Sequence, residues 1–128
     1  MVRPAVIANG LPTLDLLKAD PPYKVLGERS AYMMSETAKA AKQANMPVHT
    51  ASIGSMFTVF FSDKPVRNFD DASACDIPAF RRYFAAMLYA GIYLAPSQYE
   101  AGFLSIAHSE DDIETTLRAG AAALQSLA

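Results

Sequence analysis

The chain has 128 residues, a length that suits one domain with a hydrophobic core and is short for two. Hydrophobic residues make up 52% of it and charged residues 19%, which excludes disorder as the dominant state, and the formal net charge of −2 offers no basic surface for nucleic acid or a membrane. The single cysteine, Cys75, rules out an intrachain disulfide and favours a reducing, cytoplasmic setting, and no apolar run approaches the roughly 20 residues of a membrane span.

Two helices are predicted in the N-terminal third of the chain. The range 4–18 begins with a proline at a plausible first turn and carries apolar residues at roughly helical spacing, but Pro12 lies inside it. Because an interior proline removes a hydrogen bond and clashes with the preceding turn, we expect a kink or a break near residues 10–11. After the turn at 20–22, small and apolar residues recur every three or four positions and predict a long helix over 23–45.

The middle of the chain predicts strands and then a third helix. The range 48–63 is rich in β-formers, and 55–62, with its phenylalanines and valine, predicts a strand that is buried on at least one face. The polar range 66–74 is expected to be a loop. Asp76 is a candidate N-cap for a helix that ends before Gly91.

The C-terminal third predicts two short strands and a last helix. Strand-like runs at 91–95 and 103–107 flank a loop that contains Glu100. Ser109 is followed three residues later by the acid Asp112, which predicts a capping box at the start of the helix. The order of the elements suggests an α+β fold, in which a small, mostly antiparallel sheet has helices packed on one face.

Three parts of the chain resemble a known family. They are Gly54–Phe57, the range 80–88 that leads into Gly91–Ser97, and Tyr99–Phe103 followed by Ala107–Ser109. Through them the chain resembles, over nearly its whole length, the C-terminal portion of the glutamate-1-semialdehyde 2,1-aminomutases. These are pyridoxal-phosphate enzymes of fold type I, related to the class III aminotransferases. The N-terminal helix is similar to the linker helix of the family and is the weaker match.

The resemblance implies a division of the chain and a reaction. Residues 1–20 would be a linker helix from a larger domain, and residues 21–128 would be a C-terminal small domain of the kind found in fold-type I enzymes. The intact enzyme would convert glutamate 1-semialdehyde to 5-aminolevulinate, the tetrapyrrole precursor. Its partners would be this small-molecule substrate, the missing domain that binds pyridoxal phosphate, and a second copy of the enzyme in a homo-oligomer.

Catalysis by pyridoxal phosphate needs a lysine for the internal aldimine, an acid facing the pyridinium nitrogen and a phosphate cradle. None of the five lysines in this sequence matches the catalytic lysine loop of the family. We therefore expect the chain to be a fragment or a truncated relative of the enzyme, with no catalytic residue of its own. Alone, it should bind no cofactor and be inactive.

Glu100 is the candidate specificity residue. Related aminotransferases place an arginine after this loop to bind the α-carboxylate of the substrate, whereas here Phe103–Ile106 contains no cation. The resemblance implies that Glu100 faces the substrate cleft, where its charge would repel a misplaced carboxylate and could engage an amine or arginine. The alternative is a solvated loop glutamate. Ser55 and Ser97 are expected to line the same cleft, although a turn-stabilising role is at least as plausible for Ser55.

The remaining candidates favour structural roles. His108 titrates near neutrality, as a general base would, but a hydrogen bond near the start of the last helix is the better interpretation. His49 has no neighbours at ligand spacing, so no metal site is expected. Cys75 lacks a positioned base and is expected to pack. The predicted core contains Met33, Met56, Met87, Phe57, Phe60, Phe80 and Phe84.

Two other functions stay open on sequence grounds. One is the C-terminal domain of another class III transaminase, against which Glu100 and Leu104 argue because they stand where an arginine would be needed. The other is a stand-alone small-molecule or interaction domain that has lost its catalytic half. A continuous upstream reading frame with a phosphate loop and a lysine motif would dispose of the second.

Overall fold

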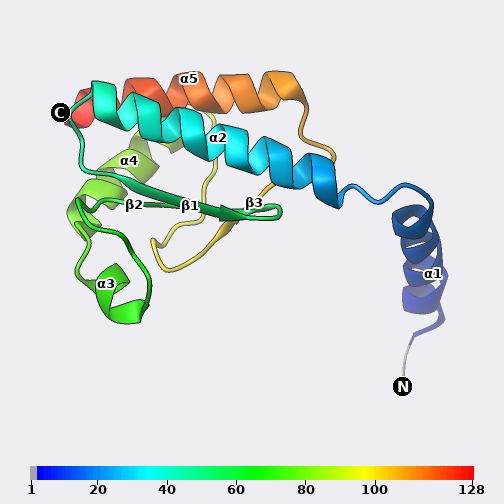
Figure 1. Cartoon of the computed structure of the whole chain (residues 1–128). Coiled ribbons are helices and arrows are strands. Elements are labelled where there is room, and N and C mark those ends of the chain that lie inside the picture. Colours follow the sequence, from blue (N-terminus) through cyan, green and yellow to red (C-terminus); the bar gives the residue numbers. More distant parts are fainter. Residues whose placement is uncertain (1–2) are drawn as a thin grey trace.

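The computed structural model describes residues 3–128, and it forms five helices and three strands over that range. Helix α1 (Pro4–Ala19) stands apart from the rest of the molecule, joined to α2 (Tyr23–Gln43) by a short connection (Figure 1). No residue of α1 is buried, and residues 1–2 of the predicted linker lie outside the described range.

The predicted break in the first helix is wrong, because α1 runs without interruption through Pro12. A proline removes one intrahelical hydrogen bond, since it has no N–H, but its fixed φ is compatible with a helix. The next residue adds a local contact, as the Thr13 hydroxyl donates to the carbonyl of Asn9 at 2.8 Å. The helix therefore accommodates the proline, with one backbone hydrogen bond fewer.

The sheet contains three antiparallel strands in the order β1–β2–β3, namely β1 (His49–Ile53), β2 (Met56–Phe60) and β3 (Gly102–Phe103). Gly54, with φ of 54°, begins the two-residue turn between β1 and β2, a backbone conformation that favours glycine. This turn pairs Ile53 with Met56 and places both on the outer face of the sheet. Met56 is consequently 40% exposed, and its prediction as a core residue is wrong.

The helices form a layer on the inner face of the sheet. Helix α2 packs on β1 and β2, α5 (Glu110–Leu127) lies alongside α2, and α4 (Ile77–Tyr89) packs against α5 (Figure 1). Both predicted caps are confirmed: Asp76 accepts from the N–H of Ala79, and Ser109 and Asp112 form the capping box of α5. The predicted α+β fold, an antiparallel sheet with helices on one face, is confirmed.

The core lies between these helices and the inner face of the sheet. It includes Met33, Met34, Val59, Phe61, Phe80, Tyr83, Met87, Ile113 and Leu124. The predicted core residues Met33, Phe80 and Met87 are buried, whereas Phe57 and Phe84 are partly buried against the cluster and Phe60 is half-buried.

A short helix replaces the predicted loop at 66–74. Helix α3 (Phe69–Ser73) has Asn68 as its N-cap, whose side chain accepts from the N–H of Asp71 at 2.9 Å. Only Ala72 of this helix is buried, so it has no apolar periodicity that sequence patterning could detect.

The predicted strand at 91–95 is wrong, and of the strand predicted at 103–107 only Phe103 is in a strand, as the second residue of β3. Ile92 and Leu94 pack against the core while Tyr93 is exposed, which produces the strand-like alternation. The segment is not part of the sheet, which among residues 3–128 consists of β1, β2 and β3. The residues of this segment therefore alternate between buried and exposed, as in a strand, but its backbone forms no strand hydrogen bonds.

Candidate functional site

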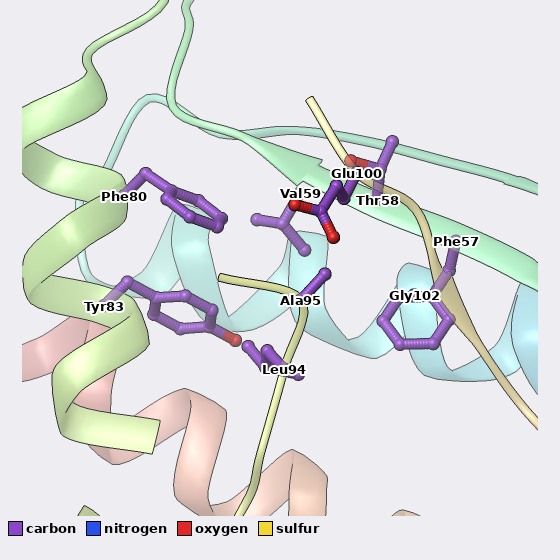
Figure 2. Close-up of a pocket in the computed structure, with 9 residues that line it drawn as sticks. All are labelled: Phe57, Thr58, Val59, Phe80, Tyr83, Leu94, Ala95, Glu100 and Gly102. Atoms are coloured by element: carbon purple, nitrogen blue, oxygen red, sulfur yellow. The ribbon is translucent and has the colours of Figure 1, made fainter. Parts of the chain in front are cut away.

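A small pocket lies between β2, α4 and two irregular segments, the ones that contain Leu94 and Glu100 (Figure 2). Its cavity volume is about 30 Å³, enough to hold a water molecule but far below the roughly 300 Å³ of a small-molecule pocket. The residues that line it are Phe57, Thr58, Val59, Phe80, Tyr83, Leu94, Ala95, Glu100 and Gly102. Glu100 is the one charged residue in this set, and most of the others are apolar.

The side chain of Glu100 points into this pocket. Figure 2 shows its carboxylate between the aromatic rings of Phe80 and Phe57. The residue is exposed on its other side, and within residues 3–128 no cation forms a salt bridge with it. The carboxylate is therefore free to attract an incoming amine or guanidinium and to repel another carboxylate.

The backbone around Glu100 is fixed by a tight turn and by the approach of an aromatic ring. The N–H of Glu100 donates to the carbonyl of Ser97 at 3.1 Å, and the N–H of Tyr99 donates to the Ser97 hydroxyl at 3.2 Å. Two residues beyond Glu100, the ring of Phe57 lies against Gly102 so closely that a Cβ there would meet ring carbons at 2.4 to 2.8 Å. Only glycine fits under the ring without a displacement.

Ser55 and Ser97 do not line the pocket around Glu100. Ser55 belongs to the turn between β1 and β2, and its carbonyl accepts from the N–H of Leu104 at 2.9 Å. Ser97 uses its hydroxyl within the loop, as described above. Of the three residues expected to line one cleft, the structure places Glu100 at the pocket and the two serines in the turns that flank it.

Sequence reasoning missed the residue that joins the Glu100 loop to the rest of the domain, which is Gln98. Its side chain is 3% exposed, and its Nε2 donates to the carbonyl of Ala72 in α3 at 2.9 Å. Next to it, the ring of Tyr99 stacks on Phe69, also of α3, with the centroids 5.5 Å apart. A glutamine in a polar loop is normally solvated, so the sequence contains no signal for this contact.

Tyr83 gives the pocket a neutral inner wall. Burial raises the pKa of its phenol to about 12, and its ring lies 5.5 Å from that of Phe61 in the core. The phenol is therefore protonated at physiological pH and contributes no charge. Glu100 alone determines the charge of the pocket.

The other candidate residues lie elsewhere. Nδ1 of His108 accepts from the N–H of Ser105 at 2.9 Å, just before α5, which agrees with the structural role expected for it. Cys75 is buried, its thiol donates to the carbonyl of Asp71 at 3.4 Å, and burial raises the pKa of the thiol, so it is a poor nucleophile. Within residues 3–128, no group of three or more His, Cys, Asp or Glu side chains could hold a metal ion, His49 included.

The described residues do not by themselves fit pyridoxal phosphate. The five lysines, Lys18, Lys24, Lys39, Lys42 and Lys64, are exposed, and none lines the pocket around Glu100. The pocket contains a single acid and no cation that could bind a phosphate. A cofactor site would need residues from outside this chain.

Three curated relatives match almost the entire chain, although no family model matches it. All three are named glutamate-1-semialdehyde 2,1-aminomutase. The protein from Citrifermentans bemidjiense is 47% identical over 125 residues, that from Heliobacterium modesticaldum 45% over 126, and that from Geotalea daltonii 44% over 125. In each case the match covers 98% of this chain and 29% of the relative.

Solved structures of transaminases share the fold. An omega-transaminase from Sphaerobacter thermophilus superposes with a TM-score of 0.69 at 23% identity, over 86% of this chain and 25% of its own. A transaminase with pyridoxal phosphate bound gives a TM-score of 0.72 at 24% identity, over 92% of this chain and 26% of its own. None of the helices formed by residues 3–128 combines the length and the hydrophobicity that a membrane-spanning segment requires. The solved structures show the fold alone, whereas the three curated relatives show that the chain corresponds, over almost its entire length, to a C-terminal portion of the glutamate-1-semialdehyde 2,1-aminomutases.

Proposed function

We propose that this chain forms one wall of the substrate cleft in a pyridoxal-phosphate enzyme that converts glutamate 1-semialdehyde to 5-aminolevulinate. The observation that carries the proposal is the identity of 44 to 47% with three curated aminomutases over 98% of the chain. The chain spans 29% of the length of those relatives, so the lysine and the phosphate cradle would come from the remaining part. Glu100 is the residue of this chain that faces the substrate.

The role of Glu100 is to select the orientation of a substrate that carries both a carboxylate and an amine. Two like charges about 6 Å apart repel each other by about 3 kcal/mol at an effective dielectric constant of 20, but by only about 0.7 kcal/mol in water. Glu100 is exposed in this chain, so water would weaken the repulsion. The discrimination therefore requires the remaining part of the enzyme to cover the pocket and exclude water.

The partners of the chain follow from the same proposal. They are a domain that binds pyridoxal phosphate, the small-molecule substrate, and a second copy of the enzyme in a cytoplasmic homo-oligomer. The exposed outer face of the sheet supports a covering domain, because Ile53 is 76% exposed and Phe103 62% exposed there. Helix α1, which buries no residue, is suited to the linker role, with residues 21–128 as the small domain.

A hybrid enzyme tests the proposal. The segment of the Citrifermentans bemidjiense aminomutase that aligns with this chain would be replaced by residues 1–128, and the purified hybrid would be supplied with pyridoxal phosphate and glutamate 1-semialdehyde. We expect 5-aminolevulinate at a rate within about tenfold of the parent enzyme, a difference of about 1.4 kcal/mol in the barrier. The matched control carries the equivalent segment of the Sphaerobacter thermophilus omega-transaminase and should not form this product.

The contrary result is equally specific. A hybrid that folds and holds its cofactor, but exchanges amino groups with a keto acid instead of forming 5-aminolevulinate, would favour the class III transaminase alternative. A hybrid that holds its cofactor and catalyses neither reaction would favour an interaction domain.

A further inference from the structure

Gln98 is a buried polar residue whose side chain is only partly hydrogen-bonded. The residue is 3% exposed, and its Oε1 has no hydrogen-bond partner within the described residues. Its Nε2 makes one hydrogen bond, to the carbonyl of Ala72. A buried carbonyl without a partner costs more than one neutral hydrogen bond contributes, so an apolar side chain of similar length would stabilise the fold at least as well.

The position of Gln98 in the loop explains what its one hydrogen bond can do. The bond from the N–H of Glu100 to the carbonyl of Ser97 closes a turn, and Gln98 lies inside that turn. Anchoring Gln98 therefore fixes the direction in which Glu100 leaves the turn. Tyr99, also inside the turn, stacks on Phe69 with 30° between the rings.

Helix α3, which Gln98 and Tyr99 contact, is itself connected to the core. Both contacts lead to α3, whose start is capped by Asn68 and whose end is followed by Asp76, and the N–H of Asp76 donates to the carbonyl of Phe61 at 2.9 Å. Phe61 is among the most deeply buried side chains of the core. The contacts thus connect the turn that bears Glu100 to the core through α3.

We propose that Gln98 is a positioning residue for Glu100, which holds the carboxylate in the pocket by tying its turn to the Ala72 carbonyl. The consequence for catalysis rests on the function proposed above, whereas the consequence for the loop does not.

The test is the replacement Gln98→Met in the 128-residue chain, with Gln125→Met, on the exposed part of α5, as the matched control. Residue-resolved amide hydrogen exchange reports directly on the turn, because the N–H groups of Tyr99 and Glu100 are both bonded to Ser97. We expect Gln98→Met to speed the exchange of these two amides by about tenfold and to leave the amide of the core residue Leu124 unchanged. An exchange rate of both amides within about twofold of the parent chain would overturn the proposal.

A second variant and a kinetic measurement test the role of Gln98 independently. Gln98→Leu also keeps the site apolar and removes the hydrogen bond to Ala72, so it should speed the same two amides. Unchanged amides in both folded variants would overturn the proposal. In the hybrid enzyme, Gln98→Met should reproduce the kinetic defect of Glu100→Gln, and the double replacement should be no worse than either one. An unmodified hybrid that is inactive would refute the proposed function alone, since the exchange rates still decide the role of Gln98.

Discussion

The replacement Gly102→Ala tests whether the ring of Phe57 really defines the backbone next to Glu100. A Cβ at position 102 would lie 2.4 Å from Cζ of Phe57 and 2.6 and 2.8 Å from its two Cε atoms, far inside van der Waals contact. The ring is partly buried against the core, so it cannot simply rotate into solvent. Overpacking of this kind costs about 1–3 kcal/mol, so we expect the free energy of unfolding to fall by about 2 kcal/mol.

Urea unfolding of the 128-residue chain, followed by circular dichroism, measures the change. Gly27→Ala is the matched control, because a Cβ at that position of α2 would meet only the Cα of Gly54, at 3.9 Å. Alanine is favoured over glycine inside a helix by about 1 kcal/mol, so the control should stabilise the chain. If Gly102→Ala were as stable as the parent chain, the packing of Phe57 on this glycine would not be a constraint and the account of the loop would be wrong.

Two pH dependences follow from the charged states. Burial raises the pKa of Tyr83 from 10.0 to about 12, so the contribution of its neutral phenol to stability is complete below pH 10 and is lost as the pH rises through 12. The replacement Tyr83→Phe should therefore reduce the decrease in the free energy of unfolding at alkaline pH. Urea unfolding at a series of pH values across this range would measure the effect. Hydrogen bonds from the Ser109 side chain and backbone hold the pKa of Asp112 below its usual 3.8, so that contribution is present above pH 3.8 and is lost as the pH falls through the lowered value. Asp112→Asn should weaken the acid dependence, which the same titration at low pH would reveal.

The long helices of this fold are readable from sequence because their signals are local. The capping pairs at Asp76 and Ser109 lie within one turn of chain, and the apolar spacing of α2 repeats over several turns. Helix α3 lacks such a repeat, because one buried alanine is its only contribution to the core. Its local signals are the cap Asn68 and the first-turn acids Asp70 and Asp71, and asparagine and aspartate in a polar stretch are just as typical of a turn.

The site is readable only in part, because its geometry depends on contacts between distant residues. The family resemblance singled out Glu100, and the structure places its carboxylate in a pocket. Gln98 and its partner Ala72 are 26 positions apart, and nothing in either residue type predicts that they meet. The sequence pattern also could not show which face of the sheet Met56 lies on, since the two-residue turn at Gly54 sets the register of β2 and thereby the face of each of its residues.

The role of Glu100 is tested by Glu100→Gln in the hybrid enzyme, with Glu28→Gln, at an exposed position of α2, as the control. The replacement keeps the shape of the side chain and removes its charge, and Glu100 forms no salt bridge among residues 3–128, so thermal stability should be unchanged. We predict that the ratio of 5-aminolevulinate formation to simple amino-group exchange falls by at least about tenfold, or about 1.4 kcal/mol at the transition state, while the control keeps the parent ratio. An unchanged rate and an unchanged product ratio would show that Glu100 is an ordinary surface residue and would contradict the account.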